Sequence, residues 1–371
     1  MAPAQNSILS LRALNRATLA RQLLLERSKL RVTPAVEHLV GLQAQLARPP
    51  FLGLWTRLAK FKRDDLREVI ARRELVRVTG IRGTLHLMSA RDYIALRGAL
   101  QPALDRGLQV LGARADGLNL PAVERTARAF FHAAPATFDA FRKHLEIRHP
   151  GGDERAMAYA VRTRVPLVQV PTEAEWSYPA AAAFALAEDW LEQKVSSAAA
   201  PPNELIRRYL AAFGPATAAD AQAWSALQGL RSTFEAMRDE LVTFRDERKR
   251  ELFDLPGAPR PDEDTDAPVR FLPEFDNFVL AHQDRSRLID EPHRSRVVTK
   301  NLQVRATFLV DGRVAGIWTA ERKKAVATLV LEPFAALPKK AVRAVEEEGD
   351  GALQFLEGDA AKRDFRWFAP A

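Results

Sequence analysis

The feature that most constrains the fold is a plan that recurs three times along the chain: short amphipathic helices followed by a β-hairpin. The recurrence lies in the order of elements and not in the residues themselves. In the first copy, apolar residues at helical spacing predict a helix over 11–29 and further helices that begin at Thr33, Pro49 and Asp64. Residues 76–88 then alternate around two glycines, which predicts a hairpin.

The second copy is the weakest of the three. Helical spacing predicts helices over 121–132, 137–146 and 154–164, followed by a short strand over 167–170. The alanine-rich residues 180–190 predict a connecting helix, and residues 196–202, rich in Ser, Ala and Pro, predict a linker.

The third copy is the clearest. Asn203, Thr217 and Ser232 are each expected to cap a helix. Strands over 241–244 and 250–253 flank a charged tip and form a wing, and residues 304–318 predict a second hairpin with a third strand over 325–331. Compact helices closed by a hairpin are the winged helix-turn-helix arrangement. We therefore expect a mainly α chain with α+β elements, built from three tandem winged helix-turn-helix units over 1–115, 116–197 and 198–371.

Composition narrows the possible chemistry. The 371 residues include no Cys, which excludes disulfides, a thiolate nucleophile and Cys-ligated metal sites and makes a reduced cytoplasm the default location. No signal peptide and no membrane span are expected, because the first six residues lack a basic start before an apolar run and arginines interrupt the segment after them.

Charge is distributed unevenly. Residues 1–115 carry 20 Lys and Arg against 8 Asp and Glu, whereas residues 116–371 carry 35 against 39. A basic excess of this kind favours a polyanion partner such as nucleic acid, because Lys and Arg release counterions from phosphates. The alternative is an arginine-rich composition spread over solvated helix faces.

Four ordered segments resemble the AlkZ family of bacterial winged-helix DNA glycosylases. They are Gly41-Leu42-Gln43-Ala44-Gln45, residues 53–58 (GLWTRL), residues 82–87 (RGTLHL), and residues 271–277 (FLPEFDN) followed by 282–287 (HQDRSR). The resemblance implies three winged-helix units around a DNA-binding concavity. It also implies excision of cationic alkylated purines, of the N7-alkylguanine type, and unhooking of interstrand crosslinks in double-stranded DNA.

The resemblance places the catalytic motif of the family, Gln-aliphatic-Gln, at Gln43 and Gln45, with alanine between them. An alkylated cationic base leaves as a neutral group and needs little acid, so amide dipoles are enough to hold water and stabilise an oxocarbenium-like sugar. An amide is a poor general base, which predicts discrimination against neutral bases. Both glutamines reach one sugar only where the helix ends or distorts, because residues i and i+2 diverge on a helix.

Alternatives to this assignment remain. Gln43 and Gln45 would otherwise be polar residues at a helix end, and neighbouring Glu37 and His38 are the other acid-base candidates. The candidate DNA-binding residues are Arg48, Arg82, His86, Asn277, Arg285, Arg287, Arg294 and Arg296. Three of these contacts have a structural alternative. His86 would form a hydrogen bond within its own hairpin, and the Asp276-Asn277 pair would cap an element of the fold. The later arginines would form ion pairs with nearby carboxylates.

No metal or other cofactor is expected, since the histidines are scattered and no glycine-rich phosphate loop is present. Two functions therefore compete. One is a monofunctional DNA glycosylase, expected to be a nucleoid-associated monomer. The other is a winged-helix transcription regulator without catalytic activity, since a fold alone does not imply a function.

Overall fold

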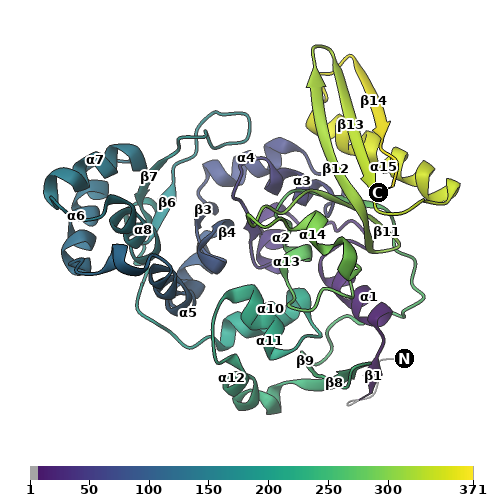
Figure 1. Ribbon diagram of the computed structural model, residues 1–371, viewed down its shortest axis with the longest axis horizontal. Helices are drawn as coiled ribbons and strands as arrows, with labels where there is room; N and C mark the ends of the chain where they lie inside the picture. Colours follow the sequence, from purple (N-terminus) through teal and green to yellow (C-terminus); the bar gives the residue numbers. More distant parts are fainter. Residues whose placement is uncertain (1–6, 371) are drawn as a thin grey trace.

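The computed structural model describes residues 7–370 and shows a mixed α/β protein (Figure 1). The α-helices are α1 Leu11–Arg21, α2 Val32–His38, α3 Pro49–Trp55, α4 Arg63–Ala71, α5 Ala90–Gln109, α6 Leu120–Ala133, α7 Phe138–Arg148, α8 Glu154–Arg164, α9 Ala187–Leu191, α10 Asn203–Phe213, α11 Ala218–Ser225, α12 Leu230–Ala236, α13 Asn277–Leu280, α14 Arg294–Val297 and α15 Lys339–Leu356. The β-strands are β1 Ile8–Leu9, β2 Leu42–Gln43, β3 Leu75–Thr79, β4 Leu85–Ser89, β5 Ala136–Thr137, β6 Leu167–Gln169, β7 Ala183–Leu186, β8 Val242–Asp246, β9 Glu251–Asp254, β10 Arg270–Leu272, β11 Thr307–Val310, β12 Arg313–Lys323, β13 Val326–Pro333 and β14 Lys362–Trp367.

The first two expected units share one sheet. Its strand order is β2-β4-β3-β6-β7-β5, so the predicted hairpin β3–β4 continues into strands that lie beyond residue 115. The joining pair is β3 with β6, in which Arg77 lies opposite Gln169. Side chains on this sheet are therefore positioned by residues from both sides of position 115.

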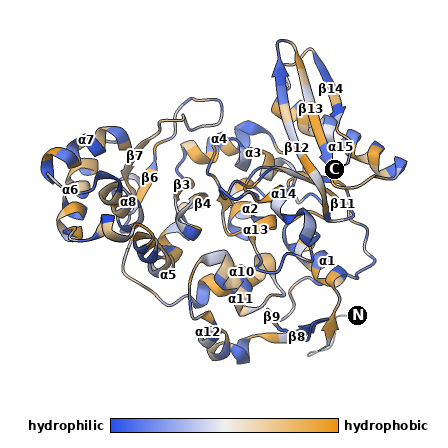
Figure 2. Ribbon diagram, viewed as in Figure 1, coloured by the Kyte–Doolittle hydropathy of each residue, from blue (hydrophilic) through white to orange (hydrophobic). Residues whose placement is uncertain are grey.

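The helices bury one face each, as their spacing predicts. In α6, Val123, Ala127 and Phe131 recur every four residues and are buried, and Phe131 packs against Phe138 and Phe141 of α7. Figure 2 shows a hydrophilic and a hydrophobic side on both α6 and α7. Fully burying such an aromatic side chain stabilises the fold by ~1.5–3 kcal/mol.

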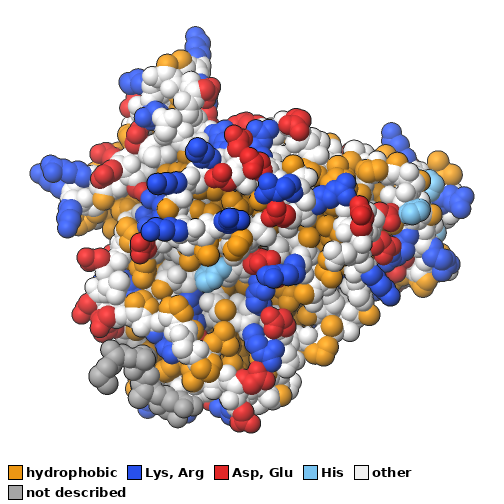
Figure 3. Space-filling model, turned by 180° about the vertical axis from the view of Figure 1, so that it is seen from behind, with side chains coloured by type: hydrophobic (Ala, Val, Ile, Leu, Met, Phe, Trp, Pro, Cys, Tyr) orange, Lys and Arg blue, Asp and Glu red, His pale blue; other side chains and the backbone are white. Residues whose placement is uncertain are grey.

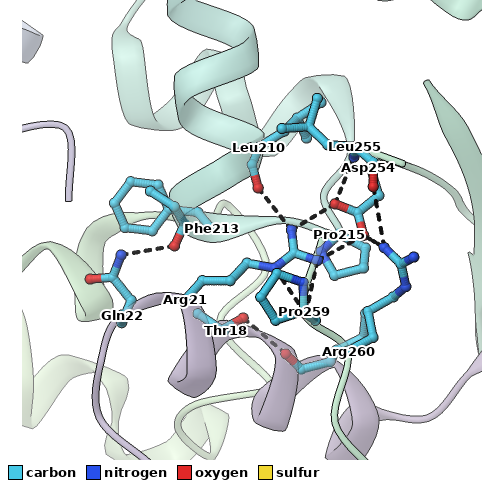
Figure 4. A network of polar contacts seen from close by, with 12 residues as sticks. Thr18, Arg21, Gln22, Leu210, Phe213, Pro215, Asp254, Leu255, Pro259 and Arg260 are labelled. Atoms are coloured by element: carbon cyan, nitrogen blue, oxygen red, sulfur yellow. Dashed lines mark hydrogen bonds and ion pairs between the residues drawn. The ribbon is translucent and has the colours of Figure 1, made fainter. Parts of the chain in front are cut away.

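The N-terminal segment joins the third unit. Strand β1 pairs in parallel with β8, and α1 packs on α10. Figure 4 shows the guanidinium of Arg21 between the Asp254 carboxylate and the carbonyl oxygens of Leu210 and Pro259. The Arg21 Nη1 to Asp254 Oδ1 distance is 2.6 Å and both side chains are fully buried, so this pair ties the first helix to the predicted wing β8–β9.

The C-terminal region forms a second α+β layer. Its sheet has the order β10-β11-β12-β13-β14, and α15 packs on it. The predicted hairpin β11–β12 and third strand β13 are confirmed, and the β12–β13 ribbon projects from the body of the molecule (Figure 1).

Several sequence expectations are wrong in detail. Residues 180–190 do not form one connecting helix: β7 comes first, because Phe184 pairs with Gln169 and packs edge-on against Phe138. The first helix ends at Arg21 rather than at residue 29. The helix expected to begin at Thr33 has Arg31 as its N-cap.

The two expected caps at Asn203 and Ser232 are also wrong, since both residues lie inside their helices. The cap at Thr217 is confirmed by a reciprocal capping box with Asp220. None of the helices within 7–370 is long and apolar enough to cross a membrane. Residues 1–6, on which the expectation of no signal peptide partly depends, lie outside the described range.

Candidate active site

The chain is extended through Gln43, where β2 pairs with β4, and it bends from Gln45 onward. Helix α2 ends at His38, and Gly41 follows with φ +82°, a conformation in which glycine carries no steric penalty. A Cβ at Gly41 would also lie 3.1 Å from the Leu87 carbonyl oxygen. The chain then pairs as β2 with β4 and re-enters a helix at Pro49. The expectation that the helix ends before the two glutamines is confirmed.

The backbone of this segment is held by side chains from other elements. Asn277 Nδ2 donates to the Gly41 carbonyl oxygen at 2.8 Å. Arg77 Nε donates to the Ala44 carbonyl oxygen at 2.8 Å, and Arg77 Nη2 donates to the Gln45 carbonyl oxygen at 3.1 Å. Burial lowers the pKa of the Arg77 guanidinium to about 10. Its charge-assisted bonds therefore fix the path of the motif from inside the sheet.

The two glutamine side chains lie in different surroundings. Gln43 is buried, and its Oε1 accepts a hydrogen bond from Arg82 Nη2 at 2.7 Å. Gln45 is exposed, and its Oε1 lies 3.4 Å from the Leu85 backbone nitrogen. A carbonyl oxygen has two lone pairs, so each glutamine keeps acceptor capacity. Gln45 is thus the residue more accessible to a substrate.

An open cavity of about 630 Å³ lies beside Gln45. Gln45 and Arg48 line it from the first part of the chain, and the segment between β6 and β7 lines it from the second. Arg48 also lies 3.8 Å from Glu357, measured from Nη1 to Oε1.

The segments of the sequence resemblance converge around Gln43. Gln43 and Gly53 line a small cavity together with Pro273 and Asn277. Behind it, Arg57 Nη2 lies 2.8 Å from Asp276 Oδ1, and both side chains are buried. Residues far apart in the sequence therefore build one site.

Arg82 lies at this site, Arg285 is close enough to Arg82 for its charge to act on it, and Arg294 acts on Arg285 in the same way. Arg82 Nη1 donates to the Trp224 carbonyl oxygen at 2.7 Å, and burial together with the charge of Arg285 lowers the Arg82 pKa to about 10. Burial and the charge of Arg294 lower the Arg285 pKa to about 10. Within residues 7–370, no carboxylate forms an ion pair with Arg82 or Arg285. We name Arg82, Arg285 and Arg294 the arginine cluster.

The remaining candidate arginines are partly engaged. Arg294 pairs with Glu291 at 3.6 Å, and the Arg296 guanidinium lies 4.5 Å from the centre of the Phe334 ring. On the face shown in Figure 3, Lys and Arg side chains gather over the middle with acidic side chains among them. On this face the basic side chains are therefore mixed with acidic ones and do not form a continuous positive patch.

Burial argues against three of the side chains that were expected to contact DNA. The side chains of His86, Asn277 and Arg287 are 0%, 2% and 4% exposed, so they do not reach a duplex in this conformation. His86 Nδ1 bonds the Thr84 carbonyl oxygen at 3.1 Å, which is the hairpin alternative, and burial lowers its pKa to about 3. Arg287 Nη1 donates to the Pro215 carbonyl oxygen at 2.9 Å.

Sequence reasoning missed Arg77, although a signal was present. Arg77 stands between Val76 and Val78 in a strand that is buried throughout, and a charged residue in such a strand has a buried partner or a function. Within the described range, no group of three or more His, Asp or Glu side chains gathers as a cation site.

Comparison with known proteins defines the class of this protein. Residues 36–355 match the family model described as DNA glycosylase AlkZ-like, and the chain belongs to this family. It is a DNA glycosylase, which decides against the non-catalytic regulator.

Two individual comparisons, one of sequence and one of structure, extend this result. The chain is 28% identical over 352 residues to the interstrand DNA cross-link repair glycosylase of Streptomyces sahachiroi, covering 88% of this chain and 91% of that protein. Its fold matches the solved structure of Streptomyces sahachiroi DNA glycosylase AlkZ with a TM-score of 0.78 and 22% identity, covering 97% of this chain and 100% of that one.

Proposed function

We propose that this glycosylase hydrolyses the N-glycosidic bond of cationic alkylated purines, with N7-alkylguanine as the representative lesion. The observation that carries the proposal is the Gln43-Ala44-Gln45 segment outside any helix, with its backbone fixed by Arg77 and with Gln45 at an open cavity. Preorganised dipoles of this kind stabilise developing positive charge at no reorganisation cost.

In the proposed reaction, water attacks C1′ of the deoxyribose while the C1′–N9 bond breaks. The bonding electron pair moves to N9, so the cationic base leaves as a neutral molecule. The attacking water loses a proton to solvent and an abasic site remains. Gln45 Oε1 orients the water and faces the oxocarbenium-like sugar, and Gln43, held by Arg82, contributes a fixed dipole.

We further propose that three winged-helix units, the first two joined through one sheet, surround a concavity that binds double-stranded DNA. Arg48, Arg296 and the arginine cluster would contact phosphates there. Units gathered in one chain suit a monomer on a single lesion in the cytoplasm. The name of the Streptomyces relative and its coverage support interstrand crosslinks as further substrates. An open site suits them, because a crosslinked base is not easily flipped into a closed pocket.

The test is release of N7-methylguanine from a methylated duplex. We compare wild type with Gln45→Ala, the Gln43→Ala/Gln45→Ala double variant and, as a matched control, Gln193→Ala at an exposed loop position. Loss of a preorganised dipole typically lowers the rate about 10²–10³-fold. We expect that loss in Gln45→Ala and a larger one in the double variant, with unchanged duplex binding by fluorescence anisotropy.

The carboxylate on the same cavity supplies the opposing outcome. Asp139 lines the cavity with Gln45. If Asp139→Asn abolishes release while the double glutamine variant retains it, a carboxylate performs the chemistry and the glutamine proposal is wrong. An inactive wild type on both N7-methylguanine and a nitrogen-mustard crosslink would reject this substrate class.

A further inference from the structure

The Gln43 amide is held at its oxygen, and this contact decides where its nitrogen lies. Arg82 carries only N–H donors, so the end of the amide that it contacts is Oε1, at 2.7 Å from Nη2. The Nε2 group, with two donors, therefore lies on the side away from the guanidinium. Because the Gln43 side chain is only 7% exposed, these donors need an acceptor close by.

Asn277 offers the complementary group. Its Nδ2 donates to the Gly41 carbonyl oxygen at 2.8 Å, and since a carbonyl only accepts, Oδ1 lies at the other end of this amide. Asn277 is 2% exposed, and within residues 7–370 its Oδ1 has no hydrogen-bond partner. Buried polar atoms nearly always have partners, so this oxygen indicates a donor from outside the chain.

The two side chains line the same small cavity. It lies between α3, which contributes Gly53, and residues 273–277. Its volume is about 10 Å³, close to the smallest volume that holds one water molecule. Water both donates and accepts, so a single molecule here is able to satisfy a donor on one wall and an acceptor on the other.

We propose that one ordered water occupies this cavity, accepting a hydrogen bond from Gln43 Nε2 and donating one to Asn277 Oδ1. Asn277 is then a positioning residue for Gln43. The inference rests on the proposed function, in which Gln43 contributes a fixed dipole. Arg82 holds the oxygen and the water holds the nitrogen, whereas one anchor alone would let the amide turn about its broad terminal torsion. This water is distinct from the attacking water, which the proposed reaction places at Gln45.

The variant Gly53→Ala removes the space for the water with little strain. A Cβ at Gly53 would lie 3.7 Å from Pro273 Cγ and 4.0 Å from Asp276 Oδ2, both in the lining of the cavity. Gly53 lies within α3, where alanine also favours the helix. Gly53→Ser places a hydroxyl in the same space, and a hydroxyl donates and accepts as water does. The matched control is Gly351→Ala in α15, where the nearest atom is Trp55 Cζ2 at 3.3 Å.

The assay is single-turnover release of N7-methylguanine, with Gln43→Ala measured beside these variants. We expect Gly53→Ala to lower kcat at least about tenfold, which is less than the about 10²-fold loss caused by a 1 Å displacement of a positioning group. Its KM should not change and its thermal midpoint should not fall. Gly53→Ser should recover most of kcat, and Gly351→Ala should keep it.

Two further measurements identify the water itself. A high-resolution crystal structure of the wild type should show it within about 3.2 Å of Gln43 Nε2 and of Asn277 Oδ1, and that of Gly53→Ala should lack it. Asn277→Ala should also lower kcat. The Gly53→Ala/Asn277→Ala double variant should lose about as much as Asn277→Ala alone, because both changes remove the same water.

Several results would overturn the inference while leaving the proposed function intact. No water between the two side chains in the wild-type crystal rejects the site, and equal kcat losses in Gly53→Ala and Gly53→Ser assign the effect to volume. Full kcat in Gly53→Ala, or losses that multiply in the double variant, rejects positioning through one water. If Gln43→Ala keeps full kcat, the proposed role of Gln43 is itself wrong and the inference fails with it.

Discussion

Replacing Arg77 by methionine should impair catalysis far more than its effect on stability alone would suggest. The change removes the two hydrogen bonds that fix the carbonyl oxygens of Ala44 and Gln45 and keeps an unbranched side chain of similar length. Gln45 is exposed, so water replaces its lost donor, whereas Ala44 is 1% exposed and its oxygen loses a partner. Leaving one buried acceptor unsatisfied costs about 1–3 kcal/mol, so we expect a loss of stability of about 2 kcal/mol.

The catalytic loss comes from geometry. A displacement of about 1 Å in a positioning group lowers rates about 10²-fold, so kcat for N7-methylguanine release should fall by about that factor. KM should change little, because Arg77 is buried and does not reach the duplex. Single-turnover kinetics at saturating enzyme separate the two quantities.

Arg97→Met is the matched control. Arg97 is also buried and donates to a backbone carbonyl oxygen, that of Thr163 at 2.6 Å, without an ion-pair partner in the described chain. It should lose comparable stability and keep kcat at a temperature where both variants are folded. If both lose kcat equally, Arg77 contributes only to stability and the positioning argument is wrong.

Three further predictions concern the basic surface, the buried histidine and the buried ion pair. Arg285→Ala should reduce the slope of log Kd against log salt by about 1, because one phosphate contact is lost, and Arg207→Ala should not; equal slopes in an anisotropy titration would contradict this. The pKa of His86 is lowered in the folded state to about 3, so the folded protein binds fewer protons than the unfolded chain below pH ~6.5, and stability falls as the pH drops from there toward 3. His86→Gln should flatten that fall in thermal midpoints measured from pH 7 to 4, and an unchanged pH profile would reject the assignment. Asp254→Asn should destabilise by about 3–5 kcal/mol, because Arg21 stays buried without its counter-charge; a chemical melt that shifts by less than 1 kcal/mol would show that other acceptors suffice.

The fold was predictable where local pattern decides it. The hairpin over 76–88 and the wing with strands over 241–244 and 250–253 follow from alternation and turn residues, and the structure forms both, with the wing strands at 242–246 and 251–254. Strand β7 was not predictable in this way, because alanine favours helix and the strand exists only through pairing with β5 and β6. Strand β1 likewise exists only through its pairing with β8, more than two hundred residues away.

The candidate site was likewise predictable only in part. The resemblance suggests Gln43 and Gln45 as catalytic candidates, and their spacing explains why they do not share one face of a helix. The partners that hold them did not follow, because Arg77 and Arg82 reach the motif through long side chains whose direction depends on packing. The same limit explains why His86 was expected to reach DNA when the sheet encloses it.

The orientation of Gln43 depends on residues outside its own part of the chain. One guanidinium, that of Arg82, donates both to Gln43 Oε1 and to the carbonyl oxygen of Trp224 in α11. The charge of Arg285 acts on the same guanidinium. A shift of α11 relative to the β3–β4 hairpin would therefore move the Arg82 guanidinium and change the direction of the Gln43 amide. Because DNA phosphates would contact the arginine cluster, the proposed geometry links duplex binding to the orientation of the Gln43 dipole.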